Sequence, residues 1–437
     1  MNNHPIIIET LSPLHIGKGD SLTSVGEYVA TSNRIRIIDQ VHLHNLLDEK
    51  GLQQEYMDYI LNYAKNTHVW DFFTGHKIEN EVKYNREFPL HAAAFNPDSN
   101  NILELAIETA GQKYIPGSSL KGAIRTLLFA YCIGADHSLR SRVENIIATA
   151  DDLYAIKKRI LHEEDTLLNS ELNLFRVEDS LPVAEENVVA EISKRAHLFG
   201  VRTEGLDNLR ECIDVGTLIK TTISVIPQLQ DSNLLWLNRD DLSGFFHAVN
   251  TVTDHYIDVE LKLLSKSTDS IAKEIAGELL GLQKQLKQSA DQSAILRLGK
   301  GKTFIFQVIL PMLNEASQNK IIRLLVNDAD ARINFPKTRV LTDNNKMFGW
   351  IKLSLPELPT SEINYFNNII ENPLKGVTKL KAYFLETKKV CLMYNGIFYP
   401  SLQLVNQLKT HFKKGQEIEV VLQQLSNEGK IIHVKLD

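Results

Sequence analysis

The strongest constraint on this chain is a short segment in which a turn is followed at once by a helix start. Pro116-Gly117 is a turn dipeptide, and either Ser118 or Ser119 is a suitable helix N-cap. Apolar side chains then recur at helical spacing as far as Gly134, and they are Leu120, Ile124, Leu127, Leu128 and Tyr131. The segment therefore predicts an amphipathic helix that begins directly at the turn.

Two cations, Lys121 and Arg125, lie on a second face of this predicted helix. No acidic residue occurs from residue 109 to residue 135, although the whole chain has a formal net charge of -6. The unpaired N–H groups and the dipole of a helix start favour a phosphate or a carboxylate. Two interpretations remain open: the helix start binds an anion, or the cations are only solvated.

The same residues carry a family resemblance. Residues 114–125, with the sequence YIPGSSLKGAIR, resemble the signature of the RAMP proteins, the RNA-binding subunits of CRISPR effector complexes. In that family a turn and a helix start contact the guide RNA. The resemblance therefore implies RNA contacts at Gly117, Ser118, Ser119, Lys121 and Arg125.

The N-terminal segment adds a second match. Residues 5–11 are apolar and β-branched, which predicts a buried strand, and residues 12–20 read as a loop. This loop contains the triplet Gly17-Lys18-Gly19. Such a triplet allows a backbone to approach a phosphate, although by itself it is more often a simple turn. RAMP proteins often open with a strand followed by a segment similar to SPLHIG, found here at residues 12–17. The resemblance adds His15, Gly17, Lys18 and Gly19 to the RNA-binding candidates.

A second acid-free window extends from residue 292 to residue 314. It contains a glycine-rich loop, and we expect a strand over residues 304–310 after it. Gly301-Lys302-Thr303 is reminiscent of a nucleotide-binding P-loop, but Leu296 stands where that motif needs a glycine, and a P-loop follows a strand rather than preceding one. ATP binding is therefore excluded, and no cofactor is expected.

A third acid-free window, residues 331–342, precedes Phe348-Gly349-Trp350. With that triplet, residues 335–339 (FPKTR) resemble one RAMP class, the terminal subunit of the type III-A (Csm) effector. The glycine-rich loop of the second window resembles the one that RAMP proteins place near the end of a ferredoxin-like domain, against RNA. The resemblance covers residues 5–353 and implies further RNA contacts at Arg297, Gly299, Lys300, Gly301, Lys302, Lys337 and Arg339.

We expect an α+β fold with two ferredoxin-like, RRM-like RAMP domains that carry helical insertions. The expected boundaries are residues 1–180 and 181–355 for these domains, 356–373 for a linker and 374–437 for a small basic β-rich domain. That last domain has ten lysines against five acids from residue 373 onward, which suggests an OB-like or S1-like RNA-binding barrel.

Several local expectations accompany this division. Residues 139–173 are expected to form a polar helical insert, Asp179 to serve in a cap or turn, and residues 242–264 and 271–286 to form helices. Residues 66–99 look irregular, residues 194–197 look like a break between strands, and residues 402–412 look helical. The three cysteines, Cys132, Cys212 and Cys391, have no paired spacing, which disfavours disulfides and a zinc site.

The leading functional hypothesis is a non-catalytic subunit that binds CRISPR guide RNA (crRNA) near its 3′ end and contributes to crRNA maturation and antiviral defence. Its expected partners are the guide RNA, sibling RAMP subunits of a type III effector and host ribonucleases, with no membrane, in the cytoplasm. The alternative is a metal-independent CRISPR-RNA-processing endoribonuclease that uses His15 as general base. A pure scaffold would leave the three acid-free windows unexplained.

Overall fold

The structure is a computed structural model, and the chain divides into two compact units, Met1–Leu355 and Pro356–Asp437. The residues that it describes are 2–62, 68–92, 102–173, 175–199, 208–225, 242–288, 292–302, 309–326, 337–356, 379–386, 388–394, 397–404, 412–413, 416–425 and 431–436. Within these residues, no helix is long and apolar enough to cross a membrane.

A five-stranded antiparallel sheet forms the centre of the first unit. Its strand order is β13-β15-β1-β12-β9, and the strands are β1 Asn2–Thr10, β9 Phe175–Val177, β12 Leu218–Val225, β13 Ser293–Arg297 and β15 Trp350–Ser354. Alternate residues of β1, such as Ile6 and Ile8, are fully buried, as expected for a strand with one face toward the core. The predicted first strand is therefore confirmed.

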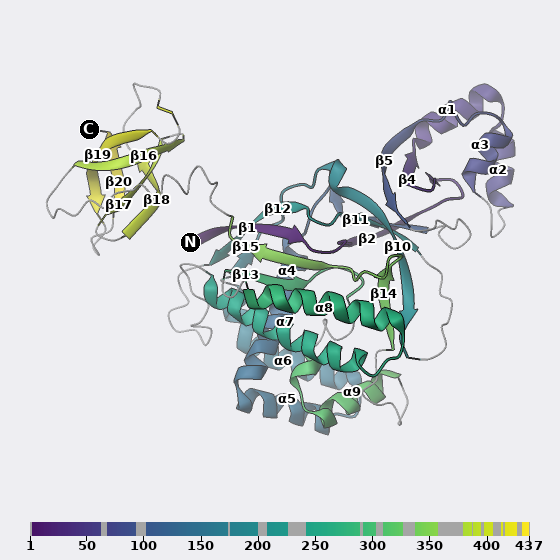
Figure 1. Cartoon of the computed structure of the whole chain (residues 1–437). Helices are drawn as coiled ribbons and strands as arrows, with labels where there is room; N and C mark the ends of the chain where they lie inside the picture. Colours follow the sequence, from purple (N-terminus) through teal and green to yellow (C-terminus); the bar gives the residue numbers. More distant parts are fainter. Residues whose placement is uncertain are drawn as a thin grey trace. The chain divides into compact units, whose positions relative to one another are not determined.

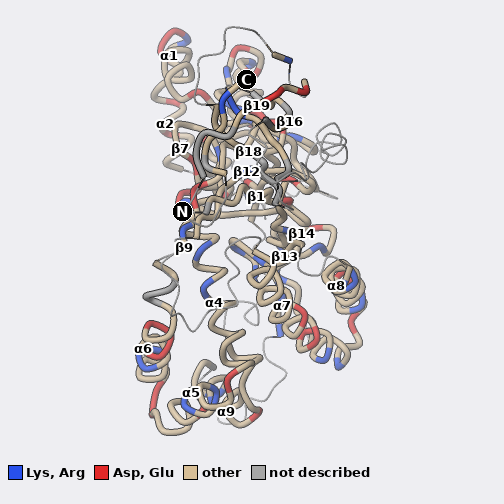
Figure 2. The backbone as a smooth tube through the Cα atoms, turned by 90° about the vertical axis from the view of Figure 1, so that its left-hand side faces the viewer, with Lys and Arg blue, Asp and Glu red and all other residues tan. Residues whose placement is uncertain are grey.

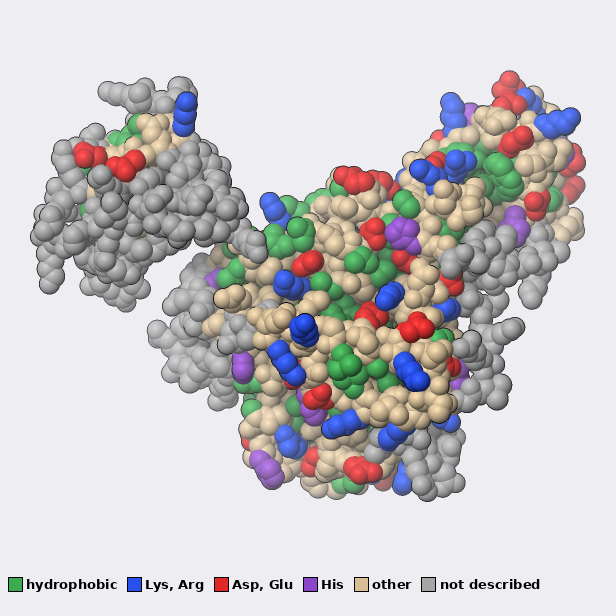
Figure 3. Space-filling view, viewed as in Figure 1, with side chains coloured by type: hydrophobic (Ala, Val, Ile, Leu, Met, Phe, Trp, Pro, Cys, Tyr) green, Lys and Arg blue, Asp and Glu red, His purple; other side chains and the backbone are tan. Residues whose placement is uncertain are grey.

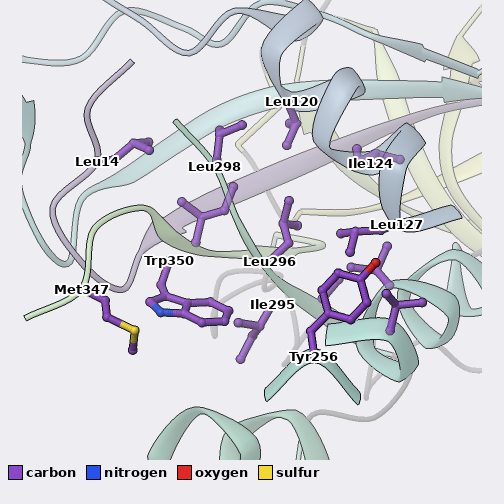
Figure 4. Close-up of a cluster of buried hydrophobic side chains, with 14 of the residues drawn as sticks. Leu14, Leu120, Ile124, Leu127, Tyr256, Ile295, Leu296, Leu298, Met347 and Trp350 are labelled. Atoms are coloured by element: carbon purple, nitrogen blue, oxygen red, sulfur yellow. The ribbon is translucent and has the colours of Figure 1, made fainter. Parts of the chain in front are cut away.

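Helices cover one face of this sheet (Figure 1). The helices nearest to it are α4 Gly117–Ala135, α7 Ser243–Leu264 and α8 Ser270–Gln288, and α5 His137–Thr149, α6 Leu153–Leu172 and α9 Glu315–Val326 pack beyond them. Figure 4 shows the α4 side chains Leu120, Ile124 and Leu127 gathered with Leu296 and Trp350 of the sheet. Each such buried apolar side chain stabilises the fold by roughly 1.5–3 kcal/mol.

A second sheet of eight strands has the order β2-β6-β11-β10-β5-β4-β3, with β14 pairing β10. Its strands are β2 Gly17–Thr23, β3 Tyr28–Ala30, β4 Arg34–Ile38, β5 Tyr84–His91, β6 Ile102–Ala106, β10 Val188–His197, β11 Asn208–Ile213 and β14 Thr338–Thr342. In both sheets, strands from before residue 180 pair with strands from after it. The two stretches expected as separate RAMP domains therefore interleave within one unit.

Three short helices extend from the second sheet: α1 Gln40–Lys50, α2 Gln53–Leu61 and α3 Val69–Gly75. They pack around a small separate core that includes Phe72 and Phe73. Asp39 caps α1 by accepting from the His42 N–H at 2.9 Å, and Gly51 ends that helix in the left-handed conformation. The irregular structure expected over residues 66–99 is wrong, because α3 and β5 lie there.

The second unit contains a closed five-stranded barrel with the order β16-β17-β18-β20-β19. Its strands are β16 Lys379–Glu386, β17 Lys389–Tyr394, β18 Ile397–Leu404, β19 Glu417–Leu425 and β20 Ile431–Leu436. A core of its own, with Leu380, Leu392 and Val434, fills the barrel. The helix expected over residues 402–412 is wrong at its start, because residues 402–404 continue β18, and residues 405–411 lie outside the described residues.

Two further local expectations need correction. Residues 194–197 do not break a strand, because they continue β10 and pair with the distant strand β14, in a register from Lys194↔Leu341 to His197↔Thr338. A strand also precedes the glycine-rich loop, because β13 ends at Arg297. The strand expected over residues 304–310 falls mostly outside the described residues, and Leu310–Met312 form a 3-10 helix. The exclusion of a P-loop now rests on Leu296, which is buried within β13.

Candidate nucleic-acid interface

The first turn of α4 is capped and closely packed by other residues of this chain. The N-cap is Pro116 rather than Ser118 or Ser119, and both serines lie within the first turn. The N–H of Gly117 donates to Oδ1 of Asp179 at 2.7 Å, which confirms the expected capping role of that carboxylate. A Cβ atom at Gly117 would lie 2.3 Å from the carbonyl oxygen of Val177. Gly117 is therefore required for close packing, and part of the predicted anion site is already occupied by Asp179.

The two cations of α4, Lys121 and Arg125, contact residues of α6. Lys121 Nζ donates to the carbonyl oxygen of Leu172 at 2.7 Å. Arg125 Nε donates to Glu164 Oε1 at 2.6 Å, and a second nitrogen of the same guanidinium donates to Asp165. Figure 2 shows acidic and basic residues together along α6, which supplies these carboxylates. The acid-free window of the sequence is therefore not acid-free in space.

His15 is a buried histidine, with 1% of its side chain exposed. Its Nδ1 lies 2.8 Å from the carbonyl oxygen of Glu211, and because a carbonyl oxygen only accepts, Nδ1 carries the proton. Its Nε2 lies 3.8 Å from Glu104 Oε2. Burial lowers the pKa of His15 below its ordinary value. Nearby, Lys18 forms ion pairs with Glu108 at 3.2 Å and with Asp20 at 3.4 Å.

The glycine-rich loop packs against the loop that contains His15. The Lys300 N–H donates to the His15 carbonyl oxygen at 2.8 Å, and Lys300 Nζ donates to Glu104 at 2.7 Å. Gly299 has φ +75°, and a Cβ atom there would lie 2.3 Å from the same carbonyl oxygen. Gly301 has φ +90°, and its Cβ would meet Phe348 at 2.9 Å. These glycines join two family motifs through close backbone packing.

Arg297 and Lys302 lie on either side of this loop and are both largely buried. The guanidinium of Arg297 donates to the carbonyl oxygen of Phe348 at 2.8 Å and lies 5.2 Å from the ring centre of Trp350. Burial lowers the pKa of Arg297 to about 10. Burial also lowers the pKa of Lys302, and the nearby Arg297 guanidinium lowers it further. Glu260 and Glu278 act in the opposite direction on the pKa of Arg297, and burial has the larger effect.

Arg339 has a different role from the one that the sequence predicted. It is fully buried, and its guanidinium contacts the carboxylate of Glu260 on α7 through two nitrogens, at 2.5 Å and 2.9 Å. We therefore correct its assignment, because a buried bidentate ion pair does not present its charge to a ligand. Lys337 is exposed beside β14, and its carbonyl oxygen accepts from the Leu198 N–H at 2.9 Å.

One cleft brings two of the acid-free windows together. It has a volume of about 380 Å³ and lies between the first three turns of α4, the glycine-rich loop and Thr253 of α7. Five of the sixteen predicted RNA-binding residues line it, namely Ser118, Ser119, Arg297, Gly299 and Lys302. The other eleven predicted residues do not line it. Its described lining contains two cations and no carboxylate.

The cleft also contains residues that the sequence did not single out as RNA-binding candidates: Gly122, Ala123, Thr126, Leu127, Thr253 and Leu298. Gly122 and Thr126 follow Ser118 at intervals of four residues, so helical periodicity alone would have placed them on the same stripe. Thr253 is far away in the sequence and had no such signal. On the face that Figure 3 shows, acidic and basic side chains are interspersed, so a local cleft is more informative than a broad charged patch.

Residues 7–306, which are more than half of the chain, match the family model described as the RAMP superfamily. This chain belongs to the RAMP superfamily. The match contains α4, the Asp179 cap and the glycine-rich loop, which are the elements that meet at the cleft and beside it.

Two curated relatives carry the name CRISPR system Cms protein Csm5. The protein from Streptococcus thermophilus is 30% identical over 128 residues, which are 27% of this chain and 36% of the relative. The protein from Enterococcus italicus is 23% identical over 245 residues, which are 51% of this chain and 59% of the relative. The chain thus matches less than two thirds of the length of either relative. It is a RAMP protein similar to Csm5.

Two solved structures have a similar fold. One is a chain of a Csm-crRNA-target RNA ternary complex of a type III-A CRISPR-Cas system, with a TM-score of 0.58, 21% identity and coverage of 81% of this chain and 100% of that chain. The other is Csm5 of T. onnurineus, with a TM-score of 0.52, 19% identity and coverage of 79% and 99%. At these identities, the likeness concerns the fold.

Proposed function

We propose that this protein is a non-catalytic crRNA-binding subunit of a type III-A CRISPR effector complex, located near the 3′ end of the guide in the cytoplasm. In this role it contributes to crRNA maturation and antiviral defence. Its partners are the guide RNA, sibling RAMP subunits and host ribonucleases. Membership of the RAMP superfamily and the similarity to Csm5 support the assignment.

The observation that carries the proposal is the composition of the cleft. Ser118 and Ser119 at the start of α4 line the same space of about 380 Å³ as Arg297 and Lys302. Phosphate groups of single-stranded RNA fit such a lining, because cations and N–H or O–H donors bind phosphate without reading the base sequence. A subunit that accepts any guide needs this kind of contact.

The endoribonuclease alternative relied on His15. A general base must come within about 3 Å of a 2′-hydroxyl group. The His15 ring is buried, its Nδ1 is engaged with a carbonyl oxygen, and its pKa is lowered. This placement favours a structural role for His15, in which its ring joins the N-terminal loop to Glu211 of β11, and it does not support the alternative.

We infer two finer features of the fold. The strands β15-β1-β12-β9, with α4 and α7 between them in the chain, have the antiparallel 4-1-3-2 order of a ferredoxin-like domain, and β13 extends it at one edge. The barrel order, numbered from its own first strand, is 1-2-3-5-4. This is an OB-like arrangement, and its strands three and five are parallel.

The cleft can be tested at Gly122. This glycine lies on α4, lines the cleft, and has open space where a Cβ atom would be. We expect Gly122→Glu to weaken binding of a labelled single-stranded RNA by about tenfold at moderate salt, because a carboxylate would face the phosphates. Ultraviolet crosslinks from RNA to peptides of residues 117–127 and 292–302 should disappear.

Two variants control for folding and charge. Gly122→Ala should keep RNA binding and stabilise α4 by about 1 kcal/mol. Gly277→Glu makes the same charge change at an exposed helical glycine of α8, also with open space, and should leave binding unchanged. Equal affinity and equal crosslinks in the Gly122→Glu chain and the unmodified chain would show that RNA does not enter the cleft.

A further inference from the structure

The helix α6 supplies the partners of both cations in the α4 motif. Arg125 Nε donates to Glu164 Oε1 at 2.6 Å, and a second nitrogen of the same guanidinium donates to Asp165. Lys121 Nζ donates to the carbonyl oxygen of Leu172 at 2.7 Å. The partner of Lys121 is thus a neutral carbonyl group, whereas Arg125 contacts two carboxylates that a bound phosphate would have to replace.

The carboxylate contacts of Arg125 lie near the surface. The side chains of Arg125 and Asp165 are 31% and 47% exposed, and that of Glu164 is 12% exposed. In the pair of Arg339 and Glu260, by contrast, both side chains are 0% exposed. Ion pairs that water reaches are weak and are screened by salt, so another anion can compete for one partner. The Arg125 contact is therefore exchangeable.

Both cations lie beside the row of α4 residues that lines the cleft. Ser118 and Gly122 line the cleft, and Lys121 and Arg125 follow them at intervals of three residues. Residues three apart on a helix are neighbours on its surface. An RNA strand that passes from the cleft across α4 therefore reaches Arg125 next, where the carboxylates of α6 already lie.

The position of α6 is set by its apolar side. Ile156, Leu168 and Leu172 are buried and belong to the main hydrophobic core. These contacts are separate from the ion pairs of Arg125. The guanidinium can therefore exchange a carboxylate for a phosphate by rotation of side chains, while α6 stays packed in its place.

We propose that Glu164 and Asp165 are a competitor for RNA within the same chain: they occupy Arg125, and a phosphate must displace them before it binds there. The inference rests on the proposed RNA-binding function and adds a regulatory contact to it. RNA that is already held in the cleft presents its next phosphate at a high local concentration, so it displaces the carboxylates more readily than RNA that touches α4 alone. The contact therefore favours RNA that fills the cleft.

The test neutralises the two carboxylates in the full chain. We expect Glu164→Gln combined with Asp165→Asn to strengthen binding of a labelled oligouridylate about 3–5-fold at moderate salt. The slope of log affinity against log salt should become steeper by about 0.7, because Arg125 gains one phosphate contact. Both substitutions keep the size of the side chain, so the thermal melt should stay close to that of the unmodified chain.

A control removes the same two kinds of charge close by. Glu163 of α6 pairs with Arg142 of α5 at 3.2 Å, and Asp151 is exposed just before α6. We expect Glu163→Gln combined with Asp151→Asn to leave the salt slope unchanged and to alter the affinity less than the first pair of substitutions does. In an Arg125→Ala chain, the first pair should no longer strengthen binding beyond this control.

Three results would overturn the inference while RNA binding by the unmodified chain upholds the proposed function. An equal gain from both pairs of substitutions would indicate a general effect of negative charge. A gain that persists in the Arg125→Ala chain would exclude this arginine as the target. Weaker binding or an unchanged slope in the Glu164→Gln, Asp165→Asn chain would give the carboxylates a structural role alone. An unmodified chain that binds no RNA would instead refute the proposed function, and this inference with it.

Discussion

Two basic segments of the first unit look alike in sequence and differ in space. Residues 297–302 and residues 337–339 are both free of acids, and both adjoin strands. The first segment lines a cleft through Arg297 and Lys302. In the second, Arg339 is buried against Glu260. The comparison shows that cations of two acid-free windows can have different surroundings, one pair at the lining of a cleft and one guanidinium in a buried ion pair.

The same distinction applies to other predicted contacts. Lys300 pairs with Glu104, Lys18 with Glu108, and Arg125 with Glu164. Each partner is distant in sequence, and each arrives through sheet pairing or helix packing. A window of local sequence therefore reports local charge, whereas the potential at the surface depends on these tertiary partners.

The largest expected effect concerns the buried pair. We expect Arg339→Ala to reduce the free energy of unfolding by about 3–5 kcal/mol, because it leaves the Glu260 carboxylate buried without its partner. The double variant Arg339→Met, Glu260→Leu should recover much of this loss, since it removes both charges. Chemical denaturation measures both. A single variant of unchanged stability that binds RNA with a flatter salt slope would return Arg339 to the RNA-binding set.

The glycine-rich loop provides the second test. We expect Gly299→Ala to destabilise the protein by about 2 kcal/mol or more, because a left-handed alanine is strained and its Cβ would meet the His15 carbonyl oxygen. Gly19 has φ +94° but open space around its Cβ position. Gly19→Ala should therefore cost only the strain, about 1 kcal/mol. Equal thermal shifts for the two variants would show that close packing at Gly299 contributes nothing.

The smallest effect distinguishes two lysines of one loop. We expect Lys302→Ala to reduce the slope of log RNA affinity against log salt by about 0.7, because Lys302 lines the cleft. Lys300→Ala should reduce it less, because Lys300 does not line the cleft and pairs with Glu104. The pKa of Lys302 is lowered by burial, so its charge and its share of the affinity are lost on raising the pH before an ordinary lysine titrates. Affinities across salt and alkaline pH measure this, and identical curves for both variants would remove the distinction.

The sequence predicted the local elements that depend on neighbouring residues. The α4 helix, the helices near residues 242–286 and the β-rich character of the C-terminal unit follow from apolar spacing and from turn residues. The sequence placed residues 402–404 in a helix, whereas pairing with β17 and β20 makes them the end of β18. RNA binding by the named residues remains a prediction.

What the sequence alone determined, therefore, is the family motifs and the elements that carry them. The tertiary structure decided which motif residues lie together and which charges remain available. Asp179 occupies the N–H of Gly117, Glu260 takes Arg339 into the core, and Thr253 completes the cleft from α7. The physical reason is range: turn and helix preferences act over a few residues, whereas ion pairing and close packing join residues that only the folded chain brings within a few ångströms.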